Sequence, residues 1–158
     1  MRSARDQAAV AAAVGGGALG ALGTFQTWFT IEIGGVAAPG GSATGLEGRD
    51  GRTVLACAVV ALLAAGLVVS SRRHVVAKIA MLAAGAVTAI VAVAGIVDAR
   101  SKADEVVDEF GIPPERVAAD VGVGLWVVAV AGVSLLAAGA AVEQRNEEFP
   151  AEPLTPAA

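Results

Sequence analysis

The sequence predicts an all-α membrane protein: a four-helix transmembrane bundle with a short β-strand or hairpin in its first outer loop and a short amphipathic helix in its second. Two observations carry this prediction. Hydrophobic residues make up 56% of the 158 residues, and the mean hydropathy is +0.70, which is high for a soluble domain. Four windows nearly free of charge are also close to the 20 residues that a helix needs to cross a hydrocarbon core.

The four windows are residues 8–25, 54–70, 75–97 and 121–142. The second is the shortest, and Thr53 and Ser71 can extend it. The first follows two arginines and is rich in glycine, so it also resembles a cleavable secretory signal peptide. Its length and the acidic Asp6 favour a span, while cleavage remains an alternative.

Orientation follows from the connection between the second and third windows. This short hairpin, SSRRHVVAK, contains Arg72, Arg73 and Lys78, and basic residues in short connections mark the cytoplasmic side. We therefore expect a multi-pass protein of the plasma membrane with both termini in the cytoplasm. Residues 26–53 and 98–120 become the two outer loops. The proline-spaced, acidic residues 143–158 are expected to form a disordered cytoplasmic tail.

The first outer loop opens with a period-2 alternation, which is typical of a strand with one apolar face formed by Phe25, Thr27, Phe29, Ile31 and Ile33. A short strand or hairpin is therefore expected here. Trp28 is interpreted as part of an aromatic belt at the membrane interface, with a ligand platform as the alternative. Asp50 is expected to cap the second membrane helix.

The second outer loop, residues 98–120, holds ten of the 26 charged residues, seven acidic and three basic. Ser101 and Asp104 have the spacing of a capping box, and Gly111 suits a helix end. The helix between them would have one apolar stripe and one acidic face, and Pro113 and Pro114 would lead into the fourth span. The stripe comprises Ala103, Val106, Val107 and Phe110.

The acidic face comprises Asp104, Glu105, Asp108 and Glu109. Acids one helical turn apart repel each other, and a divalent cation would relieve that repulsion. The favoured interpretation is simpler: the four carboxylates are solvated, and the segment is an external cap that its charges keep out of lipid.

The spans themselves carry little chemistry. Lys78 lies near the cytoplasmic end of its span and can extend to the interface, so no ionisable group is expected at mid-membrane. Cys57 is the single cysteine and His74 the single histidine, which excludes a Cys-x-x-Cys redox site and leaves a nucleophile–base pair unsupported. We expect no enzyme, no cofactor and no metal. Basic stripes for nucleic acid are absent as well.

The spans are instead rich in small residues, including a Gly-x-x-x-Gly step at Gly16 and Gly20 that allows helices to approach closely. The chain resembles a class of small, alanine-rich, four-span actinobacterial membrane proteins, including the tryptophan-biosynthesis-associated membrane protein family. The resemblance rests on Trp28 after the first span, on Arg72 and Arg73, and on the last span, GVGLWVVAVAGVSLLAAGA. It implies a plasma-membrane location and no established activity.

The sequence thus favours a non-enzymatic membrane protein that acts by association, as an accessory, assembly or scaffold subunit. Its partners would be the lipid bilayer and either another membrane protein or further copies of itself. The alternative is a small-solute channel or transporter formed by oligomerisation, with Thr88 and Ser134 lining the path. The residues expected to meet a partner are Trp28, Phe29, Gly16, Gly20, Phe110 and Trp126.

Overall fold

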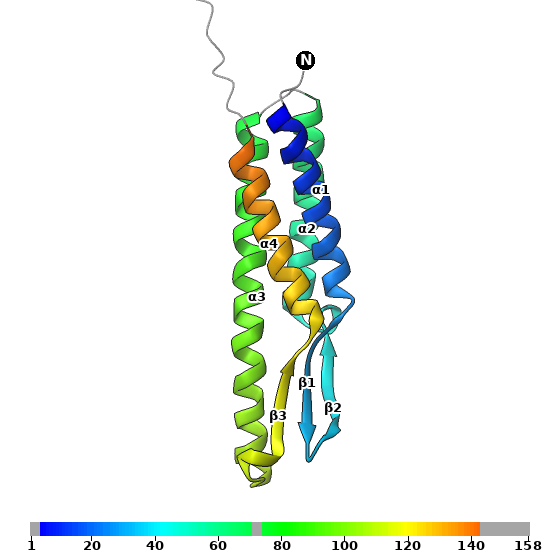
Figure 1. Cartoon of the computed structure of the whole chain (residues 1–158), viewed down its shortest axis with the longest axis vertical. Helices are drawn as coiled ribbons and strands as arrows, with labels where there is room; N and C mark the ends of the chain where they lie inside the picture. Colours follow the sequence, from blue (N-terminus) through cyan, green and yellow to red (C-terminus); the bar gives the residue numbers. More distant parts are fainter. Residues whose placement is uncertain (1–3, 71–73, 143–158) are drawn as a thin grey trace, which may run out of the picture.

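The computed structural model describes residues 4–70 and 74–142 as four long helices and a small antiparallel sheet (Figure 1). The helices are α1 (Ala4–Thr24), α2 (Arg49–Val69), α3 (His74–Phe110) and α4 (Val123–Ala141). The strands are β1 (Thr27–Ile33), β2 (Val36–Thr44) and β3 (Val117–Val121), and two 3₁₀ turns are η1 (Gly45–Glu47) and η2 (Pro114–Arg116).

All four helices are long and apolar enough to cross a membrane, as the hydropathy windows predicted. At 1.5 Å per residue, α1, α2 and α4 are each about 28–32 Å long, which matches a hydrocarbon core of about 30 Å. The helices α1 and α2 begin at Ala4 and Arg49, before the predicted windows. The windows start later because they exclude the polar residues in the first turn of each helix. The helix α2 follows Gly48, so the prediction that Asp50 is its cap was wrong by two residues.

The four helices are arranged around the axis of the bundle in the order α1–α4–α3–α2. Small residues lie where these helices contact each other most closely. A Cβ atom added at Gly85 of α3 would lie 2.7 Å from the backbone nitrogen of Leu136 in α4. One added at Gly132 of α4 would lie 2.8 Å from the backbone nitrogen of Ala89 in α3. Glycine is therefore required where these two backbones approach each other most closely.

The three-stranded sheet stands at the end of the bundle opposite the start of α1, in the order β2–β1–β3 (Figure 1). Strands β1 and β2 form the predicted hairpin through Gly34 and Gly35, whose φ angles of 62° and 82° suit a tight hairpin turn. Strand β3 was not predicted. It pairs antiparallel with β1 from Phe29 opposite Val121 to Ile33 opposite Val117, and so links the two loops.

The prediction of a separate short helix in the second loop was wrong. The helix α3 runs unbroken for 37 residues, so about 25 Å of it extends past a hydrocarbon core and lies beside the sheet. The Ser101 hydroxyl does not cap a helix, since it donates to the Val97 carbonyl one turn back, at 3.3 Å. Gly111 ends α3 with φ 60°, as expected. The chain then continues through η2 into β3, and not directly into the last span.

Two sets of predicted features lie outside the described residues: the pair Arg72 and Arg73, and the tail at residues 143–158. The described segments next to them show which helix ends lie together. The start of α1, the end of α2, the start of α3 and the end of α4 share one end of the bundle, and the sheet occupies the other (Figure 1).

Candidate functional site at the cap

The part of the molecule beyond the bundle is called the cap here and comprises residues 25–53 and 98–122. It includes the sheet, both 3₁₀ turns, the first turn of α2 and the end of α3. The cap holds ten acidic and five basic residues, so its net charge is −5, more negative than the −4 of the whole chain. The polar chemistry of the described residues is thus concentrated at one end.

Trp28 anchors the cap to the bundle. Its side chain is 7% exposed, and its indole N–H donates to the Gly23 carbonyl at 3.0 Å. Glycines form the walls of its pocket: a Cβ atom at Gly45 would lie 2.5 Å from the indole, and one at Gly124 would lie 2.8 Å from it. The prediction of an interfacial belt position was therefore wrong for Trp28, because the indole is enclosed by its own chain.

The Gly-x-x-x-Gly step is also internal. A Cβ atom at Gly16 would lie 3.1 Å from the Leu135 side chain, and one at Gly20 would lie 3.6 Å from Ala131. Both glycines are buried where α1 packs on α4. They join helices within one chain and are not available to a neighbouring molecule.

A cleft of about 230 Å³ lies where the sheet meets α2 and α3. Its polar lining includes Glu47, Asp50, Asp98 and Lys102, beside the ring of Phe29. The Lys102 ammonium lies 3.1 Å from an Asp98 carboxylate oxygen and 4.5 Å from the centre of the Phe29 ring. This cation–π contact places Phe29 in an internal role, since it connects β1 to the extended part of α3.

Polar groups of the cleft bond to one another. Its lining offers carboxylates, Lys102 and the hydroxyl of Thr44, with no serine, cysteine or histidine among the lining residues. Glu47 is already engaged, because its Oε2 atom accepts a hydrogen bond from the Thr44 backbone N–H at 3.1 Å. Lys102 and Asp98 are engaged with each other in the ion pair described above.

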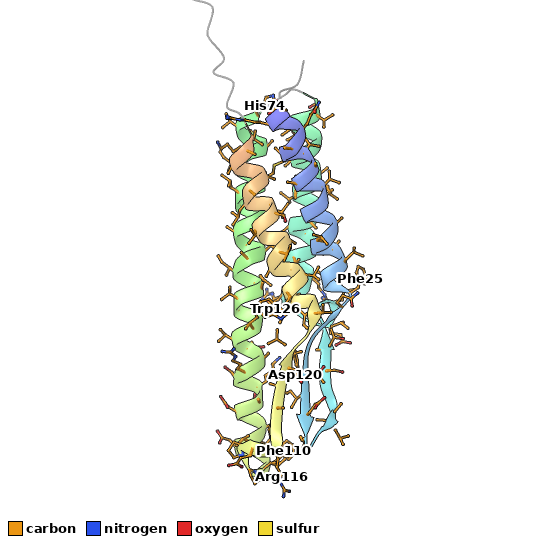
Figure 2. All side chains as sticks on the ribbon, viewed as in Figure 1. Phe25, His74, Phe110, Arg116, Asp120 and Trp126 are labelled. Atoms are coloured by element: carbon orange, nitrogen blue, oxygen red, sulfur yellow. The ribbon has the colours of Figure 1, made fainter. Side chains whose placement is uncertain are left out.

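A second cavity is apolar and lies further from the bundle. This groove, of about 440 Å³, is enclosed between β1, β2 and the last turns of α3. It is lined by Ile31, Ile33, Ala38, Gly40, Gly41, Val106, Phe110 and Ile112. Phe110 stands at its edge with 66% of its surface exposed, near the tip of the cap (Figure 2).

The acids Asp104, Glu105, Asp108 and Glu109 are all exposed on the extended part of α3. Among residues 4–70 and 74–142, no three acidic, histidine or cysteine side chains are grouped closely enough to hold a metal ion. The cation site that the like-charged pairs suggested therefore has no structural support.

Trp126 lies in the first turn of α4 with 57% of its surface exposed. Figure 2 places it, like the 61% exposed Phe25, where the bundle joins the cap. An amphipathic indole at that level suits the interface between lipid and water. Trp126, and not Trp28, has the position expected of an aromatic belt.

The remaining candidate polar residues lie elsewhere. His74 is at the opposite end of the bundle from the cap (Figure 2). Cys57 is partly buried and packs against the core, as expected for a small apolar residue. Thr88 is fully buried, and the Ser134 hydroxyl donates to the Val130 carbonyl of its own helix at 2.8 Å.

The sequence identified Phe110 and the α3 stripe but missed both cavities. Each cavity joins the first loop to α3, so its residues come from segments more than 40 positions apart in the chain. Alternating apolar residues in β1 were the one local signal, since Ile31 and Ile33 now line the groove. The comparisons add no further guide, because no protein-family model, curated protein or solved structure matches this chain.

Proposed function

We propose that this protein is a non-enzymatic, multi-pass membrane protein that works by association, as an accessory, assembly or scaffold subunit. In this proposal both termini are cytoplasmic, and the cap lies on the outer face of the plasma membrane. The observation that carries it is the apolar groove of the cap, a surface of the kind that marks contact sites when it is exposed outside lipid.

The packing of the bundle favours the cap over the membrane helices as the contact surface. Close helix association in lipid depends on small residues at the contact. Here Gly16, Gly20, Gly85 and Gly132 all serve contacts within the chain. The outward positions of α2 and α3 are mostly larger side chains, such as Leu63 and Ile90, each 67% exposed. Those side chains suit contact with lipid tails.

The channel alternative finds less support. A pore formed between copies would need its polar lining on the outside of each bundle. Thr88 has no exposed surface, and Ser134 donates to its own helix. The Thr88 hydroxyl is therefore out of reach of a neighbouring copy, and the proton of the Ser134 hydroxyl is already engaged within its own helix. Solute flux in proteoliposomes containing the purified protein would favour the channel over the subunit.

Purification from native membranes in mild detergent tests the proposal. A stable partner, or a homo-oligomer, should be recovered with the wild-type chain. Recovery should fall in Phe110→Ser and persist in Phe25→Ser, a matched control because Phe25 is similarly exposed but lies outside the groove. A monomer recovered without partners from its own membranes would contradict the proposal.

A further inference from the structure

The height of the groove above the bilayer limits what can occupy it. The third span is free of charge from Ile79 to Val97, and Asp98 follows it. Val106 and Phe110 lie about 13 and 20 Å further along α3 at 1.5 Å per residue. The polar headgroup layer adds only about 5–8 Å on each side of the hydrocarbon core. The groove therefore lies in water, above the lipid headgroups.

The groove is nevertheless apolar along its whole lining. Ile31 at its base is 6% exposed, whereas Phe110 at its edge is 66% exposed. A volume of about 440 Å³ is enough for a few apolar side chains or a small ligand. An exposed aromatic residue beside an apolar groove is the arrangement of an interface anchor, where burial of a ring contributes much of the binding energy.

Charge distinguishes between possible occupants. From Ala103 to Val121 the chain carries six acidic residues and one basic residue, Arg116. Four of the acids are exposed in the last two turns of α3. At about 100° per residue, Glu109 and then Glu105 are the nearest of them to the line through Val106 and Phe110, whereas Asp104 and Asp108 lie on the far side of the helix. Such a field attracts basic groups and repels acidic ones over about 8–10 Å at physiological salt.

Two occupants are disfavoured by this charge. A second copy joined cap to cap would bring two surfaces together that each carry a net charge of −5. Like-charge juxtaposition across an interface is costly. A fatty acid or an anionic headgroup would meet the same repulsion, and the acyl chains of the bilayer do not reach this height. A basic partner at the groove relieves the i,i+4 repulsion of Glu105 with Glu109.

We propose that the groove binds a short apolar segment with basic residues on both sides, presented by the outer part of a partner protein. Its apolar side chains enter between the sheet and α3 and cover Phe110, and its lysines or arginines meet the nearer carboxylates of α3, those of Glu105 and Glu109. This inference rests on the proposed function as a subunit and names the chemistry of the partner.

Three synthetic peptides with one apolar core test it, flanked respectively by lysine, serine or glutamate. They are titrated against the full chain in zwitterionic nanodiscs, with empty nanodiscs as the baseline. The lysine-flanked peptide should bind about tenfold tighter than the serine-flanked one, equivalent to about 1.4 kcal/mol. The glutamate-flanked peptide should bind weakest. The lysine advantage should shrink between about 50 mM and about 500 mM salt, as screening requires.

Two variants separate the groove from the charges. Phe110→Ser should weaken all the peptides about tenfold, while Phe25→Ser should leave them unchanged. Glu105→Gln combined with Glu109→Gln should reduce binding of the lysine-flanked peptide alone. Both positions are exposed on the helix surface, so circular dichroism should show an intact fold.

Several outcomes would overturn the inference. Equal binding of all three peptides would remove the charge argument. Equal effects of Phe110→Ser and Phe25→Ser on peptide binding would show that the groove is not the binding site. Displacement of the peptide by a fatty acid would indicate a lipid site, and self-association that depends on Phe110 would indicate a second copy. If a partner is recovered from native membranes regardless of Phe110, the proposed function stands and this inference falls. If the peptides bind with the expected charge preference but no partner is recovered, the groove binds such segments and the proposed function as a subunit falls.

Discussion

The position of Trp28 makes a quantitative prediction about the link between cap and bundle. Replacing it with alanine removes a side chain that is 7% exposed and its 3.0 Å hydrogen bond to the Gly23 carbonyl. Truncating a buried Trp to Ala costs about 3–5 kcal/mol, including the cavity that remains. Trp126 supplies a matched control in the same chain, because its side chain is 57% exposed. Trp126→Ala should cost less than about 1 kcal/mol.

Hydrogen exchange measures the effect where it is expected. The amides of β1 bond to both neighbouring strands and are protected only while the cap stays docked. Trp28→Ala should lower their protection by about a hundredfold or more, since each 1.4 kcal/mol is a factor of ten. Labelling of Cys57, the single cysteine, reports in parallel on whether the bundle stays folded.

Similar protection of β1 in the two tryptophan variants would refute this reasoning. It would mean that the glycine-walled pocket contributes little and that the strands hold the cap without the indole. A loss of protection accompanied by rapid labelling of Cys57 would mean that the cap and the bundle unfold as one unit, and not that the cap undocks first.

Two further predictions concern the bundle and its orientation. Gly85→Ala should destabilise the protein by about 1–3 kcal/mol in denaturant titration, because its Cβ atom would press on α4. Gly15→Ala, which has open space within 4 Å, should be neutral or stabilising by up to about 1 kcal/mol, and a larger loss there than at Gly85 would contradict the packing. In a Cys57→Ala background, an impermeant thiol reagent outside intact cells should modify Phe110→Cys and leave Ser70→Cys unmodified. Modification of both or only of Ser70→Cys would overturn the proposed orientation.

The membrane helices were predictable because their signal is local. Each span is a continuous run of apolar residues, and the requirement for internal backbone hydrogen bonds in lipid acts within that run. The hairpin was predictable for a similar reason: alternation in β1 is followed by Gly34 and Gly35. Turn chemistry and side-chain period agree there.

The cap was harder to predict because its order depends on contacts between distant segments. Val117, Ala119 and Val121 do alternate with Ala118 and Asp120. Five residues are nevertheless too few to predict a strand unless the strand that pairs with them, β1, is also known to lie beside them. Ser101 followed by Asp104 suggested a helix start. However, no residue between Val97 and Ser101 breaks a helix, so α3 continues through this segment to Phe110.

The fate of Trp28 shows the same limit. An indole placed just after a membrane helix is ordinarily interfacial. Its burial here depends on space left by glycines of two distant segments, at positions 45 and 124, and on the hydrogen bond to the Gly23 carbonyl. Those residues become neighbours only in the folded chain, and no pattern near Trp28 identifies them.

The strand order has a consequence for biosynthesis. The middle strand, β1, is synthesised soon after the first membrane helix, and its hairpin partner follows at once. Its other neighbour, β3, emerges only after two more helices have been made. A nascent chain shorter than about 120 residues thus leaves one edge of β1 unpaired, which is a surface for holding factors or proteases to recognise. Since β3 ends at Val121, immediately before α4, pairing of that edge marks a chain that has only its final helix left to insert.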